Sequence, residues 1–161
     1  MTGATMNGLP VKTSQVITTQ MVLPNDTNPL GNLLGGTLMH WIDIVAAIAA
    51  QRQAGRICVT ASVDEINFHK PIRLGEIVTL QASVNRVFHT SMEVGVMVMA
   101  QNLDGHPPRR ANYAYLTFVA IDEVGRPAHV QPVLPESVEE MRRYEDAGRR
   151  RSMRLEHRED L

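Results

Sequence analysis

The sequence predicts an α+β fold in which one antiparallel sheet packs along a single buried helix. Residues 35–54 form a helix-favouring stretch that is apolar nearly all the way round, as is typical of a core helix. Four later segments are rich in β-branched and alternating apolar residues, and short turn-like sequences separate them. A parallel sheet would need crossover helices between these segments, and the sequence offers none there.

The expected helix has recognisable ends. Gly35 and Gly36 open it, it runs to about Ala54, and Gly55 is suited to a left-handed terminator. Strands are expected on both sides of the helix in the chain. We expect them at residues 13–23, 57–68, 76–88, 91–101 and 110–121.

Alternation along residues 76–82 and 91–98 makes one face of the sheet apolar. Val78, Leu80 and Ala82 share that face in the first of these segments. In the second it is formed by Met92, Val94, Val96 and Val98. A sheet with one apolar face and a helix that is apolar all round bury each other, which favours the α+β arrangement.

Three parts are expected along the chain. Residues 1–12 are small and polar and are expected to form a disordered leader, and residues 13–135 form the folded domain. Residues 136–161 hold close to half of the charged side chains and are expected to form a solvated helical tail. A capping box at Ser137–Glu140 would begin this helix. Three i,i+4 ion pairs are expected along it, Glu139–Arg143, Glu145–Arg149 and Asp146–Arg150.

Length and composition narrow the functional classes. A chain of 161 residues fits one domain, and a formal net charge of −1 gives no general attraction to nucleic acid or an anionic membrane. The single cysteine, Cys58, excludes an internal disulfide. The N-terminus lacks a signal-peptide pattern and no apolar run is long enough to span a membrane, so a cytoplasmic protein is expected.

Asp43 is the candidate catalytic residue. It is the only carboxylate in the apolar helix, where an unpaired buried charge costs several kcal/mol. Either Asp43 lies on a narrow solvent-facing edge of the helix, or it performs chemistry as a base or a nucleophile. We favour the chemical role because of the residues that precede the helix.

Those preceding residues supply an oxyanion site and a polar side chain. Gly35 and Gly36 leave the first amides of the helix uncovered, so that the Gly36 N–H can polarise a carbonyl group. Asn28 offers both a donor and an acceptor and suits the positioning of water or substrate, although asparagine before proline is also a common turn residue. For Asn32, bracing of the loop and substrate contact are both open.

The order of these motifs resembles the acyl-CoA thioesterases of the hotdog fold, more narrowly the cytosolic acyl-CoA hydrolases that include the YciA-type and brain enzymes. The resemblance spans residues 13–125. It rests on Asp26–Asn32, Gly35-Gly36, Asp43 in the helix and the run from Asp64 to Glu76. It implies an acyl-CoA substrate, catalytic Asp43 and Asn28 contributed by opposite subunits, and a homo-oligomer that is at least a dimer and commonly a trimer of dimers.

The same resemblance suggests residues that bind coenzyme A. Lys70, Arg109 and Arg110 are candidates for its phosphates. Thr90 and Ser91 resemble pantetheine contacts, and Phe68 would flank the adenine, with Gly35 near the substrate. A purely structural role is equally open for these side chains. The length of acyl chain accepted would depend on residues such as Trp41, Ile44, Val45 and Met92.

Other chemistries are less favoured. The histidines show no metal-ligand spacing, and no cofactor or metal is expected. Cys58 is expected to be a buried strand cysteine. His40 is expected to pack or to lie in an interface, and the arginine run 149–151 to solubilise or to contact another subunit. Two rivals remain, an acyl-CoA-binding sensor without hydrolysis and a dehydratase, although no histidine replaces Asp43 as the latter would require.

Overall fold

The computed structural model describes residues 8–68 and 70–159. Before the long helix lie β1 (Leu9–Pro10), a 3-10 turn η1 (Val11–Ser14), β2 (Val16–Met21) and a second 3-10 turn η2 (Pro24–Asp26). The long helix α1 (Gly35–Ala54) follows, and after it come β3 (Cys58–Val63), β4 (Ile77–Phe88), β5 (Ser91–Gln101), β6 (Arg109–Ala120), β7 (Val133–Leu134) and a second helix, α2 (Val138–Glu159).

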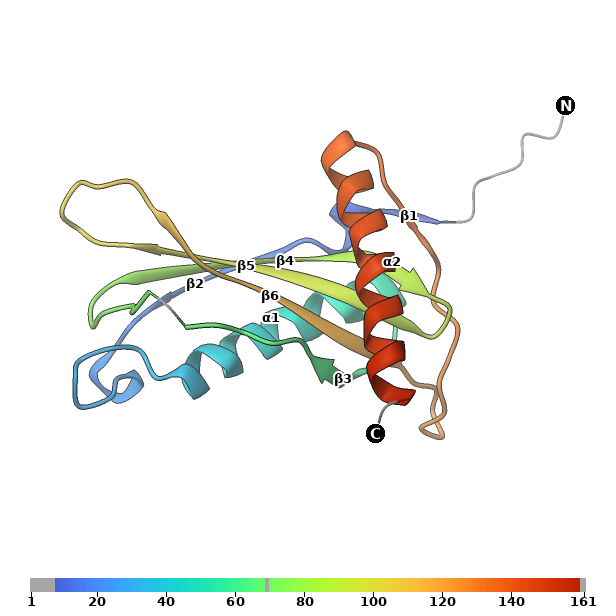
Figure 1. Ribbon diagram of the computed structural model, residues 1–161, viewed down its shortest axis with the longest axis horizontal. Coiled ribbons are helices and arrows are strands. Elements are labelled where there is room, and N and C mark those ends of the chain that lie inside the picture. Colours follow the sequence, from blue (N-terminus) through green and yellow to red (C-terminus); the bar gives the residue numbers. More distant parts are fainter. Residues whose placement is uncertain (1–7, 69, 160–161) are drawn as a thin grey trace, which may run out of the picture.

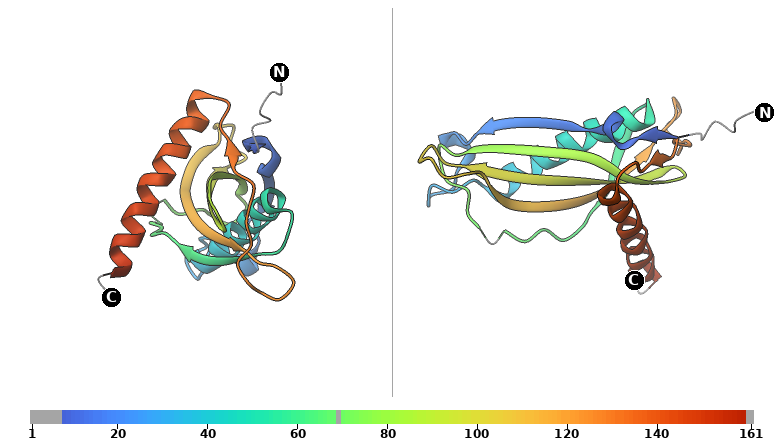
Figure 2. Two further views of the ribbon diagram at one scale, coloured as in Figure 1. Left: turned by 90° about the vertical axis from the view of Figure 1, so that its right-hand side faces the viewer. Right: turned by 90° about the horizontal axis from the view of Figure 1, so that it is seen from above.

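The main sheet has five strands in the order β2-β4-β5-β6-β3, and every neighbouring pair is antiparallel. It curves around α1, which lies along its concave face, and α2 crosses its other face (Figures 1 and 2). The α+β arrangement with a sheet wrapped around one helix, expected from the hotdog resemblance, is therefore confirmed. None of the described helices has an apolar stretch long enough to cross a membrane.

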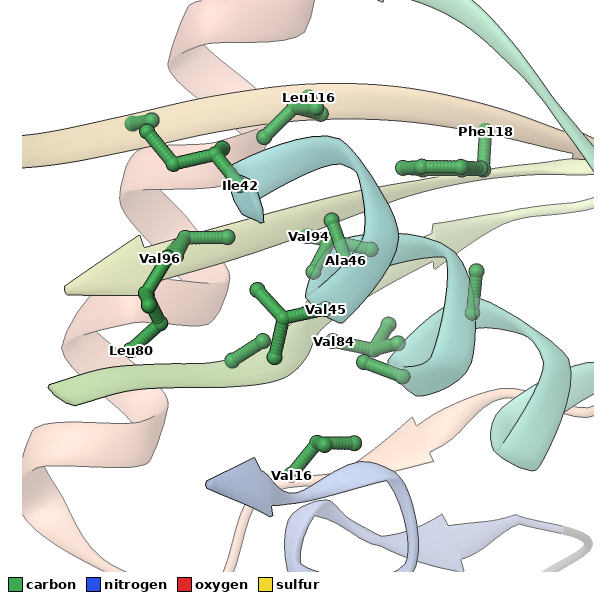
Figure 3. Packing of buried hydrophobic residues seen from close by; sticks show 14 of the residues in the cluster. Val16, Ile42, Val45, Ala46, Leu80, Val84, Val94, Val96, Leu116 and Phe118 are labelled. Carbon is green, nitrogen blue, oxygen red and sulfur yellow. The ribbon is translucent and has the colours of Figure 1, made fainter. Parts of the chain in front are cut away.

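The core lies between α1 and the concave face. Ile42, Val45 and Ala46 of α1 are buried and point at the sheet (Figure 3). The facing side chains come from alternate positions of β4, β5 and β6, namely Leu80, Val84, Val94, Val96, Leu116 and Phe118. Small residues at Ala46, Ala49 and Ala50 let the helix approach the sheet closely, so a methyl-sized change there would be felt.

The predicted ends of α1 are confirmed, whereas two strands are shorter than expected. Gly55 has φ 65° and its N–H donates to the carbonyl of Gln51 at 2.8 Å. β2 begins only at Val16 because residues 11–14 form the 3-10 turn. β3 ends at Val63, and the chain then leaves the sheet as an irregular loop rather than continuing as a strand to residue 68.

The expectation of a disordered leader at residues 1–12 is corrected for its last part. Leu9 and Pro10 form β1, which pairs in parallel with β7, and Val11 is 5% exposed. These residues are ordered because Val11 joins the hydrophobic core. Residues 1–7 lie outside the described residues.

The C-terminal helix keeps its predicted start, and although most of its side chains are exposed, one face of it contacts the sheet. The capping box is present, since the Glu140 N–H donates to Ser137 Oγ at 3.1 Å and the Ser137 N–H donates to Glu140 Oε2 at 3.2 Å. Of the three expected i,i+4 pairs, Glu139–Arg143 is formed. Asp146 instead contacts Arg142 and Arg149, because Arg150 turns inward to the sheet.

Candidate functional site

Asp43 lies on α1 at the edge of the helix that faces β3. Its side chain is neither fully buried nor fully exposed, and Thr60 Oγ1 of β3 donates a hydrogen bond to Asp43 Oδ1 at 2.7 Å. One carboxylate oxygen is thus oriented by the sheet. The carboxylate thus has a hydrogen-bond partner and is also partly exposed. This arrangement is compatible with both alternatives from the sequence, a solvent-facing edge of the helix and a chemical role.

The N-terminus of α1 presents unused amides. Leu34, the N-cap residue, gives no side-chain hydrogen bond, and the helix's own bonding starts with the Leu38 N–H, which donates to the Leu34 carbonyl at 3.0 Å. The amides of Gly35, Gly36 and Thr37 come before the first intrahelical bond, as the first amides of any helix do. In many helices the side chain of the N-cap residue accepts a hydrogen bond from one of these amides, but Leu34 cannot do so. A Cβ added to Gly36 would meet nothing within 4 Å, so the space beside the Gly36 Cα is open.

Phe68 packs beside the same helix terminus. A Cβ added to Gly35 would lie 3.7 Å from the Phe68 ring, which is ordinary van der Waals contact, and the Phe68 side chain is half exposed. Phe68 therefore forms a wall beside the Gly35 amide. Its predicted contact with adenine stays a prediction.

Asn28 performs the turn role in the structure. Its Oδ1 accepts hydrogen bonds from the Leu30 N–H at 3.0 Å and the Asn32 N–H at 3.1 Å. These two bonds fix the amide orientation, so the Nδ2 group is the part of Asn28 that remains to act as a donor. The Asn32 carbonyl accepts from the Asn28 N–H at 2.8 Å, and Asn32 thus braces the loop.

A cavity of about 300 Å³ connects the loop and the helix terminus. Asn28, Gly35, Phe68 and Lys70 all line it, so four of the predicted site residues are brought together. The other lining residues are Asn32, Leu33, Leu38, Pro71, Ile72 and Asn112, and Asp43 is not among them. Asp43 lies eight residues beyond Gly35, about 12 Å along the axis at the rise of an α-helix.

Lys70 and Arg110 also line a larger groove on the outer face of the sheet. This groove has a volume of about 610 Å³ and runs between β6 and α2. Lys70 borders both spaces, whereas Arg110 borders only the groove. Both side chains are exposed and placed to meet an anion, and their predicted phosphate contacts stay predictions.

Arg109 is a structural residue. Its guanidinium contacts Glu76, which is 1% exposed, and donates to the carbonyl of Pro71 at 2.9 Å. Burial acts to raise the pKa of Glu76, but the hydrogen bond from Arg109 and the N–H of Arg73 outweigh it and hold this pKa below its ordinary value. Arg109 therefore stabilises the turn before β4, and its guanidinium is already bonded to Glu76 and Pro71 rather than left for a phosphate.

Thr90 and Ser91 lie at the far end of the sheet. Thr90 lies in the turn between β4 and β5 and Ser91 begins β5, at the end of the sheet opposite the one at which α1 begins (Figure 1). Ser91 Oγ accepts a hydrogen bond from Arg151 of α2 at 3.1 Å, and the Thr90 carbonyl accepts from the Ala120 N–H. In this chain the two residues are not brought to the cavity beside Asn28, and their pantetheine role stays a prediction.

Cys58 and His40 are not among the residues that line the cavity beside Asn28, and His69 lies outside the described residues. Burial raises the pKa of the Cys58 thiol to about 11, and the side chain is 8% exposed, as expected of a buried strand cysteine. His40 is exposed on α1. In the described part of the chain, no three His, Cys, Asp or Glu side chains are grouped so as to hold a metal ion.

Thr60 is the functional residue that the sequence did not reveal. It sits in an edge strand of mixed apolar and small polar residues, where one threonine looks like any other. Only the pairing of β3 with β6 and the packing of α1 against that sheet bring it to Asp43.

Comparison with known proteins gives a consistent family. The thioesterase superfamily is matched over residues 30–104. The uncharacterized acyl-CoA thioester hydrolase YkhA of Bacillus subtilis is 41% identical over 143 residues, which is 89% of this chain and 83% of that protein. Mouse acyl-coenzyme A thioesterase 11 is also 41% identical, over 88% of this chain but 24% of its own length. The chain thus spans about a quarter of the mouse and rat relatives named thioesterase 11 and acetyl-coenzyme A thioesterase.

Solved structures agree. An acyl-CoA hydrolase from Bacillus cereus has a TM-score of 0.91 at 33% identity, covering 95% of this chain and 93% of that one. A hexameric acyl-CoA thioesterase has a TM-score of 0.90 at 38% identity, covering 94% and 97%. An acyl-CoA hydrolase from Staphylococcus aureus, with butyryl-CoA and CoA bound, has a TM-score of 0.84 at 38% identity, covering 94% of each chain. That protein was also solved with its own Asp43, Asn28 or Thr60 replaced by alanine.

Proposed function

The chain belongs to the thioesterase superfamily, and on that basis we propose that it hydrolyses acyl-CoA thioesters to free CoA and a carboxylic acid. The observation that carries the proposal is the hydrogen bond from Thr60 of β3 to Asp43 of α1. The N-terminal amides of the same helix have no side-chain cap. The proposal places a held carboxylate and an anion-stabilising helix terminus in one reaction site.

In this proposal Asp43 acts on the attacking water. The water forms the new C–O bond with the thioester carbonyl while Asp43 accepts its proton, and the carbonyl electrons pass to an oxyanion. Collapse of this intermediate breaks the C–S bond, and the proton returns to the departing thiolate. In the alternative route Asp43 itself attacks, giving an anhydride and a thiolate, and water then cleaves the anhydride. Thr60 supports both routes by holding one carboxylate oxygen.

The Gly36 N–H is proposed as the oxyanion donor and the Asn28 Nδ2 as the group that positions the water or the thioester. The N-terminus of α1, which has no side-chain cap, and the orientation of the Asn28 amide support these assignments. Asn28 lines the cavity at the start of α1 and Asp43 does not, so we propose that the two residues meet across a subunit interface.

The proposed assembly is a homo-oligomer, at minimum a dimer. β3 is an edge strand with the apolar residues Val59 and Val63 exposed on it, Ile57 is exposed just before it, and Ile44 is exposed beside Asp43 on α1. An exposed strand edge with apolar side chains is suited to pairing with another chain. The hexameric state of a structural relative makes a trimer of dimers the specific expectation.

Coenzyme A is proposed to lie with its acyl end near Asp43 and its charged end toward Lys70 and Arg110. Lys70 borders both the cavity beside Phe68 and Gly35 and the groove on the outer face, and Arg110 borders the groove. Thr90 and Ser91 would then contact pantetheine only from a neighbouring subunit, because within one chain they lie at the opposite end of the sheet.

The experiment that tests the function is release of free thiol from a panel of short to long acyl-CoAs. Wild type is compared with Asp43→Ala and Asn28→Ala, and Glu123→Ala, an exposed carboxylate in a surface turn, is the matched control. We expect Asp43→Ala to lose about 10²-fold or more in kcat, the scale of a positioned base, while the control keeps wild-type rates. Size-exclusion chromatography with light scattering checks that each variant keeps its assembly.

Two outcomes would overturn the proposal. Binding of acyl-CoA without thiol release from any of the panel would favour a sensor built on this fold. Full activity in a correctly assembled Asp43→Ala protein would remove Asp43 from the chemistry.

A further inference from the structure

The end of β3 is tied to the C-terminal helix by a buried charge network. Glu93 of β5 is completely buried, and four hydrogen bonds reach its carboxylate. Asn85 donates at 3.0 Å, Arg150 donates twice at 2.7 and 3.0 Å, and Arg154 donates at 2.5 Å. Both arginines come from α2, so this carboxylate holds the helix on the outer face of the sheet.

Arg154 extends the network to a second carboxylate. Its Nε donates to Asp64 Oδ1 at 2.8 Å and its Nη2 to Asp64 Oδ2 at 2.9 Å, which is a bidentate pair. Both side chains are about three-quarters buried, with 22% and 26% exposed. A two-point contact between planar groups fixes direction as well as distance, and a lysine cannot reproduce it.

Asp64 lies between β3, which holds the proposed catalytic carboxylate through Thr60, and the loop that we call the substrate loop, residues 64–71. β3 ends one residue earlier, at Val63, and carries Thr60, the partner of Asp43. The loop that follows carries Phe68 and Lys70, which border the cavity at Gly35. The backbone of Asp64 is itself fixed, since its N–H donates to the Tyr115 carbonyl at 3.0 Å.

β3 needs such an anchor. Within the chain it pairs with β6 alone, and the register shifts between Thr60 and Ser62. A bulged edge strand is held less firmly than a central one. The loop after it has no regular secondary structure up to Pro71 in its described residues.

From these contacts we propose that Arg154 is a positioning residue for the active site: by gripping Asp64 it sets the start of the substrate loop, so that α2 belongs to the substrate-binding machinery. The proposal rests on the proposed thioesterase function for its kinetic consequence, but the anchoring itself is independent of it. The ion pair between Glu93 and Arg150 holds α2 on the sheet. Arg154, held in place by the same helix, then fixes Asp64 at the start of the substrate loop.

The test compares Arg154→Met, Asp64→Asn and the double variant with Arg158→Met. Arg158 lies one turn further along α2 and is exposed, so its loss controls for charge and for helix propensity. The first readout is amide hydrogen exchange over residues 62–75 in the intact protein without ligand. We expect exchange to be about tenfold faster in Arg154→Met and Asp64→Asn and unchanged in Arg158→Met.

The kinetic readout separates positioning from chemistry. We expect the KM for acyl-CoA to rise about fivefold or more in both single variants while kcat changes less than about twofold, because Asp43 and Thr60 keep their contact. Arg154→Lys should recover little of the loss. Because Arg154 acts through Asp64, the double variant should be no worse than the worse single variant.

Unchanged loop exchange and an unchanged KM in Arg154→Met would overturn the proposal, as would additive effects in the double variant. If the wild type releases no thiol from any acyl-CoA while loop exchange still responds to Arg154→Met, the thioesterase proposal fails and the anchor stands.

Discussion

The hydroxyl of Thr60 on β3 donates a hydrogen bond to Oδ1 of Asp43 on α1, with 2.7 Å between the two oxygens. This contact links the wrapped helix to the edge strand at the residue proposed to perform the chemistry. Under the proposed mechanism, Oδ2 is then the oxygen that meets an incoming water or thioester.

Replacing Thr60 by valine removes this donor and keeps the shape of the side chain. We expect kcat to fall about tenfold or more, because a hydrogen bond to a charged group contributes about 1.5–3 kcal/mol. Thr60→Ser keeps the hydroxyl and should keep most of the activity. Steady-state thiol release measures both variants, and equal rates for valine and serine would show that the contact has no part in catalysis.

Asn28 allows its turn role and its proposed chemical role to be separated. Asn28→Asp keeps the Oδ1 acceptor for the Leu30 and Asn32 amides but loses the Nδ2 donor. We expect thermal stability close to wild type and a kcat lower by about 10²-fold. A fully active Asn28→Asp enzyme would reduce Asn28 to a turn residue, whereas a destabilised one would show that the turn does not tolerate the charge.

Glu76 predicts a defined pH dependence of stability. Its folded-state pKa lies below the ordinary value of 4.5, because Arg109 and the Arg73 N–H outweigh the effect of burial. The unfolded chain therefore takes up a proton first as the pH falls, and the stabilisation present above pH 4.5 is lost as the pH drops through the folded-state pKa. Glu76→Gln should lack this component.

Urea unfolding of wild type and Glu76→Gln at a series of pH values measures the effect. The difference in free energy of unfolding should be largest near neutral pH and should shrink progressively below pH 4.5. A difference that stays constant down to acidic pH would contradict the assignment of the pKa shift to Glu76.

The fold was predictable from the sequence because its signals are local and repeated. Alternation in residues 91–101 places Val94 and Val96 on the helix face, and Gly55 marks the end of α1 by the backbone angle it adopts. Part of the ion pairing along α2 was mispredicted for the opposite reason. Arg150 has a favourable partner four residues earlier, yet it turns to Glu93, which is 57 residues away in the chain. A rule based on i,i+4 spacing considers only residues of the same helix and so cannot predict a partner on a distant strand.

The candidate site divides in the same way. Asp43 stands out as the only carboxylate in an apolar helix, and Gly35-Gly36 stands out as a helix start. Thr60 and Arg154 have no such contrast with their neighbours, because their significance comes from strand pairing and helix docking. Arg109 shows the converse, since a cation that the sequence suggests for phosphate binding is paired with a buried carboxylate.

Cys58 offers a test of a chemistry that the structure disfavours. Burial raises the pKa of its thiol to about 11, so the thiolate is scarce at pH 8. We expect iodoacetamide to label the folded protein far more slowly than the urea-unfolded protein at this pH, as followed by mass spectrometry. Cys58→Ala should hydrolyse acyl-CoA at the wild-type rate, and a loss of activity in a stable Cys58→Ala protein would reopen a cysteine mechanism.

The edge strand β3 makes the proposed assembly testable by one surface charge. Val59 is 44% exposed in the single chain, so Val59→Lys costs little in the fold of one subunit, but it places an ammonium group where another subunit is proposed to pair. Val124→Lys is the control, since Val124 is 73% exposed in the turn after β6. Light scattering and thiol release are measured on the same samples. We expect Val59→Lys to dissociate and to lose activity while its circular dichroism stays that of a folded protein, because Asp43 and Asn28 would no longer meet across subunits. A dissociated Val59→Lys protein with full activity would instead require both residues to act within one chain.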